Sequence, residues 1–107
     1  GLDTFCPIGP NIITADEIAD PQALTIITTV DGVEKQNGTT ANMIFKVAFL
    51  IEYLSRAFTL NPGDMIMTGT PSGVGKAMKP PQFMVDGTIV SVEIDGIGKI
   101  TNSCHML

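Results

Sequence analysis

The 107-residue sequence predicts an α+β fold, or a mostly β one, on three observations. Two stretches of alternating apolar and polar residues each surround an Asp-Gly pair, at residues 31–32 and 95–96, which is the pattern of a β-hairpin. Between them, residues 40–58 carry apolar side chains at helical spacing. A chain of this length is expected to be one domain or a piece of one.

The first part of the chain is interrupted by prolines. Three prolines and a glycine within residues 1–21 prevent a continuous element and leave room for a short strand at residues 12–14. Residues 24–30 then alternate as a strand, and Asp31-Gly32 supplies a type I′ turn signal. The return strand is expected to be short, over residues 33–36.

The helical run between the hairpins is the strongest single pattern. Its predicted apolar face consists of Met43, Ile44, Val47, Leu50, Ile51, Leu54 and Phe58. Thr39 or Thr40 is expected to accept a hydrogen bond from the first helical turn as its N-cap. The helix should end before Asn61-Pro62, because proline disfavours helical backbone angles in the residue that precedes it.

After Pro62 the pattern turns to β. Residues 64–68 are predicted to form a short strand, and residues 69–82, rich in glycine, proline and lysine, a loop. The second hairpin follows, with Val90, Val92 and Ile94 on one face of its first strand, a turn at residues 95–98, and Ile100 and Asn102 on its return strand.

Charge and hydropathy exclude two classes of partner. The formal net charge is −5, with six scattered Lys and Arg residues, so no basic cluster could neutralise nucleic-acid phosphates. Apolar stretches are far shorter than the roughly twenty residues of a membrane span, and the first residues lack the pattern of a signal peptide. The hydrophobic content of 44% is high for this length. We therefore expect part of the apolar surface to be covered by another chain or by a further segment.

The two cysteines, Cys6 and Cys104, have no His or Cys at metal-ligand spacing and are expected to be free thiols in a cytoplasmic protein. Three of the eleven acidic residues precede a glycine and are typical of turns, and no E-x-E or D-x-D pair occurs. Ser72 does not lie in a nucleophile elbow, and His105 is interpreted as a strand or tail residue rather than a base.

The stretch Thr68-Gly69-Thr70-Pro71 allows two interpretations. Glycine permits close approach of a ligand to the backbone, and a threonine hydroxyl can donate to a carboxylate or enolate oxygen. The same residues are also common in loops that bind nothing, and composition alone does not decide between the two.

Three blocks of the sequence together resemble a known family. "LDTFCPIGPNIITADEIADPQ", "NGTTANMIFKVAFLIEYLSRAFTLNPGDMIMTGTPSGVG" and "GTIVSVEIDGIGKITN" follow the order and spacing of the C-terminal half of the catalytic domain of the fumarylacetoacetate hydrolase family, from Leu2 to about Asn102. The resemblance implies that residues 1–107 are a single partial domain. Its fold would be a mixed β-roll, similar to a β-sandwich, with one long helix.

The resemblance also implies an activity. Members of the family are Mg²⁺- or Mn²⁺-dependent enzymes, usually homodimers. They hydrolyse, decarboxylate or isomerise small 2-oxo or β-dicarbonyl acids, such as acylpyruvates or 2-hydroxyhepta-2,4-diene-1,7-dioate. In the family the metal chelates the 2-oxo acid end of the substrate and stabilises the developing enolate.

Few of the family's site residues fall on this sequence. Thr70 matches the threonine that binds the substrate's carboxylate or carbonyl oxygen, with Gly69 allowing close approach, and Thr4 matches a threonine beside the metal. The metal ligands (an E-x-E pair and an aspartate), a lysine, and the acid–base residues of the hydrolytic members are expected upstream of Gly1. No catalytic residue or metal ligand is therefore assigned here.

Two hypotheses follow. The chain is either the C-terminal part of such an enzyme, inactive by itself, or a truncated relative that serves as a dimerisation or subunit module. The sequence does not choose among hydrolase, decarboxylase, isomerase and lyase, nor does it identify the substrate. It also leaves open the oligomeric state and whether the natural protein is longer.

Overall fold

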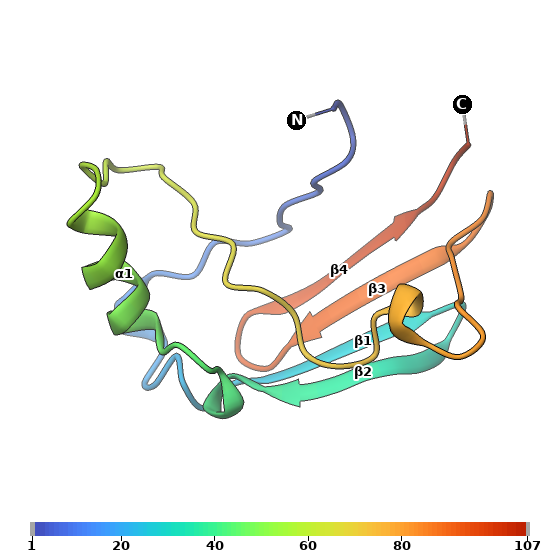
Figure 1. The fold of residues 1–107 in the computed structure, drawn as a ribbon, viewed down its shortest axis with the longest axis horizontal. Helices are drawn as coiled ribbons and strands as arrows, with labels where there is room; N and C mark the ends of the chain where they lie inside the picture. Colours follow the sequence, from blue (N-terminus) through green and yellow to red (C-terminus); the bar gives the residue numbers. More distant parts are fainter. Residues whose placement is uncertain (1, 107) are drawn as a thin grey trace.

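The computed structural model of the protein describes residues 2–106. Its four strands, β1 (Thr25–Val30), β2 (Val33–Thr39), β3 (Ile89–Ile94) and β4 (Gly98–Ser103), form one antiparallel sheet in the order β2-β1-β3-β4 (Figure 1). The helix α1 (Val47–Ser55) lies at one end of this sheet. Three short 3₁₀ turns, η1 (Ala15–Glu17), η2 (Thr40–Asn42) and η3 (Gly75–Ala77), complete the elements. The α+β prediction is confirmed.

Both predicted hairpins are present, because their turns are specified locally. Asp31 and Gly32 have φ of 49° and 77°, the positive angles that a type I′ turn requires at both central positions. The carboxylate of Asp31 also accepts a hydrogen bond from the Ile89 backbone N–H at 2.8 Å, which ties this turn to the start of β3. The two hairpins are joined by the pairing of β1 with β3.

Strand β2 is longer than predicted and continues to Thr39. Asn37 and Gly38 were expected to end it, but they pair with Ile27 and Ile26 on β1. The register shifts between Thr28 and Thr29, so one extra β2 residue bulges there. A paired neighbour strand has therefore overridden a local turn signal.

The helix α1 is shorter than predicted. Lys46, at its N-cap, has an extended backbone (φ −70°, ψ 156°), which separates α1 from η2. Thr39 caps η2 through the Ala41 N–H and does not cap α1. The cap of α1 comes from Gln22, whose side-chain oxygen accepts the Val47 N–H at 2.6 Å.

The two additional strands predicted at residues 12–14 and 64–68 are not formed in the described chain. A strand is defined by a hydrogen-bonded neighbour, and neither stretch pairs with a strand among residues 2–106. The backbone N–H of Asp64 donates instead to the carbonyl of Asn61, which makes a turn. A short apolar run between turn residues was therefore insufficient to predict pairing.

The described residues do not enclose an apolar core. The two buried residues are threonines, Thr28 and Thr88, whereas large apolar side chains such as Ile44 (90% exposed) and Met67 (86%) face solvent. Phe45, just before α1, and Phe49 and Tyr53, on α1, are exposed and stack in series, with ring centroids 5.2 and 6.0 Å apart.

The predicted apolar face of α1 is only partly packed. Val47, Leu50 and Leu54 are half-buried, while Ile51 and Phe58 are exposed. A helix that is apolar on nearly every side is typical of one buried in a larger protein. Within residues 2–106, no helix has the length and apolar character that a bilayer crossing requires.

Candidate functional site

The loop that carries Thr70 is fixed against strand β2. The side-chain Nε2 of Gln36 donates one hydrogen bond to Thr70 Oγ1 at 2.8 Å and another to the carbonyl oxygen of Pro71 at 2.9 Å. Gln36 is half-buried on β2, and Thr70 is exposed. The sheet therefore determines where the Thr70 hydroxyl lies.

The glycines of this loop allow its backbone to touch its neighbours. A Cβ on Gly73, where φ is 105°, would lie 1.9 Å from the backbone oxygen of Lys35, and a Cβ on Gly75 would lie 1.9 Å from the backbone oxygen of Gln82. On β2, a Cβ on Gly38 would approach Pro71 Cβ to 2.9 Å. Gly73 and Gly38 therefore let the loop pack against β2, whereas Gly75 allows a close contact within the loop.

Gly69 differs from them. Its φ is 98°, and no atom outside Gly69 and its two chain neighbours lies within 4 Å of where its Cβ would be. The glycine is therefore required for the turn, while the space beside it is open. Open backbone next to a hydroxyl is the geometry that lets a small ligand approach closely.

A cavity of about 510 Å³ lies between this loop and the β2–α1 connection. Thr68, Gly69 and Thr70 form part of its wall. Other polar lining residues are Asn37, Thr39, Thr40, Asn42 and Ser72. Hydroxyl and amide groups thus converge on one space from two segments that are far apart in the sequence, and we call this space the polar cavity. Its apolar lining residues are Ile26, Met43, Ile44, Phe45, Leu50 and Pro71.

A second cavity, of about 690 Å³, lies between the sheet and residues 70–85. Its lining is mainly apolar, including Val90 and Val92 of β3 and Phe83 of the loop, with Lys35 also contributing. Thr70 alone among the described residues lines both cavities. Its hydroxyl is thus placed where a mainly apolar cavity meets one lined by many polar groups.

Thr4, the other predicted site residue, lies apart from these contacts. It belongs to a turn in which the Phe5 N–H donates to the Leu2 carbonyl at 3.3 Å, and it lines neither cavity. Its φ of 67° is uncommon for a β-branched residue. Among residues 2–106, no hydrogen bond links Thr4 to Thr70 or Gly69.

No group of three or more His, Cys, Asp or Glu side chains among residues 2–106 is close enough to hold a metal ion. The carboxylates of Asp20, Asp31, Asp64 and Asp86 each accept a backbone N–H. These contacts stabilise turns, which confirms the turn interpretation of Asp31 and Asp86. Cys6 and Cys104 are free thiols.

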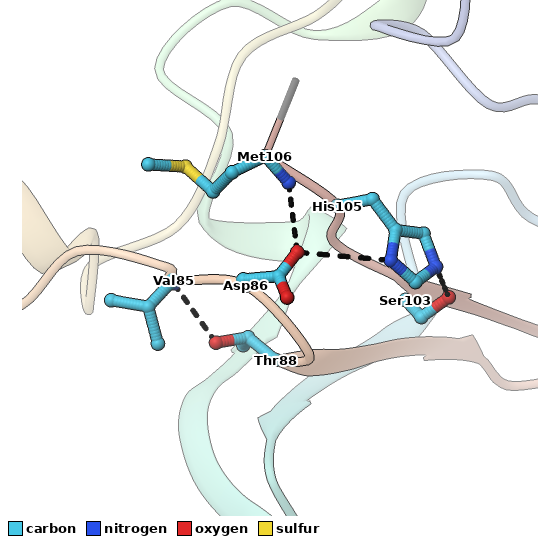
Figure 2. Close-up of polar contacts among 6 residues, drawn as sticks. All are labelled: Val85, Asp86, Thr88, Ser103, His105 and Met106. Carbon is cyan, nitrogen blue, oxygen red and sulfur yellow. Dashed lines mark hydrogen bonds and ion pairs between the residues drawn. The ribbon is translucent and has the colours of Figure 1, made fainter.

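His105 lies in the tail that follows β4 (Figure 2). Its Nε2 is 3.1 Å from Ser103 Oγ, and its Nδ1 is 3.8 Å from an Asp86 carboxylate oxygen, which also accepts the Met106 N–H. The order of the three side chains is that of a Ser-His-Asp triad, but those of His105 and Asp86 are 75% and 69% exposed. None of them lines either cavity. These contacts attach the tail to the turn before β3.

Sequence patterns alone did not single out Gln36 or Asn37, and they indicated Thr39 only as a possible helix N-cap. One signal was available: β2 reads Val-Glu-Lys-Gln-Asn-Gly-Thr, with apolar character only at its first position. A strand with so few apolar residues presents polar groups on both faces, and here they face the loop that carries Thr70.

Comparison with known proteins gives a consistent result. The family model described as fumarylacetoacetate (FAA) hydrolase C-terminal matches residues 1–105. A relative in Burkholderia cenocepacia, whose name assigns it no substrate, is 53% identical over 100 residues. The match covers 92% of this chain and 36% of the relative, so the chain spans about a third of the length of the curated relatives it matches.

Solved structures share the fold. Fumarylacetoacetate hydrolase from Exiguobacterium antarcticum is 43% identical with a TM-score of 0.95, over 99% of this chain and 38% of that one. Maleylpyruvate hydrolase from Sphingobium sp. SYK-6, solved with manganese(II) and pyruvate, is 38% identical with a TM-score of 0.87, over 96% of this chain and 36% of that one. 2-Hydroxyhepta-2,4-diene-1,7-dioate isomerase from Mycobacterium marinum is 46% identical with a TM-score of 0.84, over 98% of this chain and 38% of that one.

Proposed function

The chain belongs to the fumarylacetoacetate hydrolase family, and from this premise we propose that it forms part of a divalent-metal-dependent enzyme. The enzyme acts on a C–C bond or an enol of a small 2-oxo or β-dicarbonyl acid. Relatives named as a hydrolase and as an isomerase support this range of reactions. Acylpyruvates and 2-hydroxyhepta-2,4-diene-1,7-dioate are the substrate types to which we give priority.

One observation carries the proposal: Thr70 and Gly69 lie together on the wall of the polar cavity. In the proposed complex the Thr70 hydroxyl donates to a carboxylate or keto oxygen of the substrate, and the open space beside Gly69 lets that group reach the loop backbone. A hydrogen bond to an ionised acceptor is worth about 1.5–3 kcal/mol. This hydrogen bond would help to bind and orient the substrate. Thr70 would transfer no proton in the reaction.

The described residues do not by themselves fit a divalent ion, which needs several convergent oxygen ligands. We propose that Mg²⁺ or Mn²⁺ is bound by carboxylates that this chain does not contain, and that the 107-residue chain alone is therefore inactive. Thr4 is proposed as a support residue of that metal site. Its strained backbone is consistent with this role, since such conformations cluster at functional sites.

A second candidate function has its own observation. No large apolar side chain is buried among residues 2–106, and the stacked rings of Phe45, Phe49 and Tyr53 are exposed. The chain would then be a non-catalytic module that covers these side chains by dimerising or by binding a further subunit. We also propose that the enzyme is a homodimer, which would use apolar surface of the same kind.

Intact mass of the natural protein, followed by Mn²⁺ and Mg²⁺ titration calorimetry on the same sample, distinguishes the two functions. The enzyme hypothesis predicts a mass well above 11.3 kDa together with metal binding. A mass of 11.3 kDa without metal binding would contradict it and leave the module. Pyruvate, present with manganese in one relative's structure, is the first ligand to titrate.

A further inference from the structure

We propose that Gln36 is a positioning residue for Thr70, which fixes the Thr70 hydroxyl as a donor toward bound substrate. The inference rests on the proposed function and extends it to a residue outside the T-G-T-P stretch. The two hydrogen bonds from Gln36 Nε2, to Thr70 Oγ1 and to the Pro71 carbonyl, carry the argument.

The orientation of the Gln36 amide follows from its partners. A backbone carbonyl can only accept a hydrogen bond, so the group that faces Pro71 O at 2.9 Å must be the NH₂ and not the amide oxygen. The same NH₂ lies 2.8 Å from Thr70 Oγ1. Its two protons satisfy these two acceptors, and the Thr70 oxygen is therefore an acceptor on the side of β2.

A hydroxyl has a single proton. With its oxygen accepting from Gln36, Thr70 can use this proton only in another direction. Its partner within the loop is the Pro71 carbonyl at 3.3 Å, which is long compared with the usual 2.7–2.8 Å of an O–H···O bond. A carboxylate in the cavity would be a stronger acceptor than this contact. The geometry thus leaves the Thr70 proton available to an anionic ligand.

The position of Gln36 is itself held by packing. It pairs across the sheet with Thr28, which is only 8% exposed, and it follows the register shift that bulges β2. A Cβ on Gly73 would lie 3.0 Å from Gln36 Cγ, so the missing side chain leaves room for the amide to reach the loop. A residue restrained in this way can restrain Thr70 in turn.

The substitutions that test the proposal keep the length of the side chain. Gln36→Met removes both N–H donors and should weaken pyruvate binding about tenfold, the ratio that corresponds to one hydrogen bond of roughly 1.4 kcal/mol. Gln36→Glu replaces the donor by an anion that accepts the Thr70 proton and repels a carboxylate, so it should weaken binding more than Gln36→Met does. The control is Gln82→Met, because Gln82 bonds to Lys35 and not to Thr70.

The experiment measures the affinity of pyruvate, in the presence of Mn²⁺, for the full natural polypeptide that contains this sequence. The variants are combined with Thr70→Val in a double-mutant cycle. If Gln36 acts through Thr70, Gln36→Met causes no further loss once Thr70 is valine. If Gln36 has a merely structural role, Gln36→Met weakens pyruvate binding by the same factor whether residue 70 is threonine or valine, and that result would overturn the proposal. A loss of affinity below twofold for Gln36→Met alone would also overturn it.

Two further outcomes are distinguishable. If thermal unfolding shows that Gln36→Met does not fold, the isosteric Gln36→Glu decides the question, and affinity equal to that of the wild type overturns the inference. If the wild-type protein binds no pyruvate with Mn²⁺ and turns over no 2-oxo acid, the proposed function fails, and the role of Gln36 fails with it. If the wild-type protein binds pyruvate and neither Gln36→Met nor Gln36→Glu changes the affinity, the proposed role of Gln36 is wrong while the proposed function stands.

Discussion

Gln22 caps a helix that begins 25 residues later in the sequence: its Oε1 accepts the Val47 N–H at 2.6 Å, while its Nε2 donates to the Thr40 carbonyl at 2.8 Å. Lys46, the residue at the N-cap position, makes no side-chain cap of its own. One side chain therefore joins the start of η2 to the start of α1. This arrangement positions the segment that forms one wall of the polar cavity.

We expect Gln22→Ala to lower the free energy of unfolding by about 1–2 kcal/mol, because it removes a helix cap and a second hydrogen bond at once. Chemical denaturation of the natural polypeptide measures the change. Gln82→Ala is the control, since the only hydrogen bond of the Gln82 side chain among residues 2–106 is with the half-buried Lys35. Equal effects of the two variants would show that the cap contributes nothing specific.

Much of the fold could be predicted because its signals are local. Asp31-Gly32 and Asp95-Gly96 determine their turns from a few adjacent residues, and both hairpins form where expected. The start of α1 could not be found in this way, because its cap is Gln22 and not a neighbouring threonine. Strand prediction at residues 64–68 failed for a related reason, since pairing depends on a partner that local sequence does not show.

The candidate site also contains residues that a local sequence motif indicates and residues that only the folded structure brings together. Thr70 and Gly69 belong to a short motif whose residue types indicate a ligand rim, and they do line a polar cavity. Gln36 carries no such signal, because its importance comes from a contact made across 34 positions of sequence. The packing role of Gly73 likewise depends on the backbone oxygen of Lys35, which only the folded structure brings near.

A second prediction concerns the Thr70 hydroxyl. Thr70→Val keeps the shape of the side chain and removes its proton donor, so we expect the affinity for pyruvate with Mn²⁺ to fall about tenfold or more. Thr70→Ser retains the hydroxyl and should lose less. Thr59→Val, at an exposed threonine that lines neither cavity, is the control. Calorimetry on the natural polypeptide that gives equal affinity for Thr70→Val and the wild type would contradict the assignment.

A third prediction separates backbone strain from steric contact in the loop. Gly63 and Gly73 both have positive φ, 96° and 105°, but only Gly73 has an atom within 4 Å of its Cβ position. Gly63→Ala should cost about 1–2 kcal/mol from φ alone. Gly73→Ala should cost clearly more, or release the loop from β2, because the new atom overlaps the Lys35 carbonyl. Thermal and denaturant unfolding of the two variants tests this, and equal losses would show that the loop is not held as described.

The last prediction uses the exposed apolar surface. A chain with no buried large apolar side chain among residues 2–106 has little to offset the entropy of folding. The 107-residue polypeptide by itself should therefore bind a hydrophobic dye and self-associate in sedimentation experiments. Phe49→Lys, in the middle of the stack of Phe45, Phe49 and Tyr53, should reduce self-association, whereas Thr59→Lys at an exposed polar position should reduce it less. A monodisperse monomer that binds no dye would mean that the exposed aromatic side chains are not a self-association interface. That result would contradict a module that dimerises.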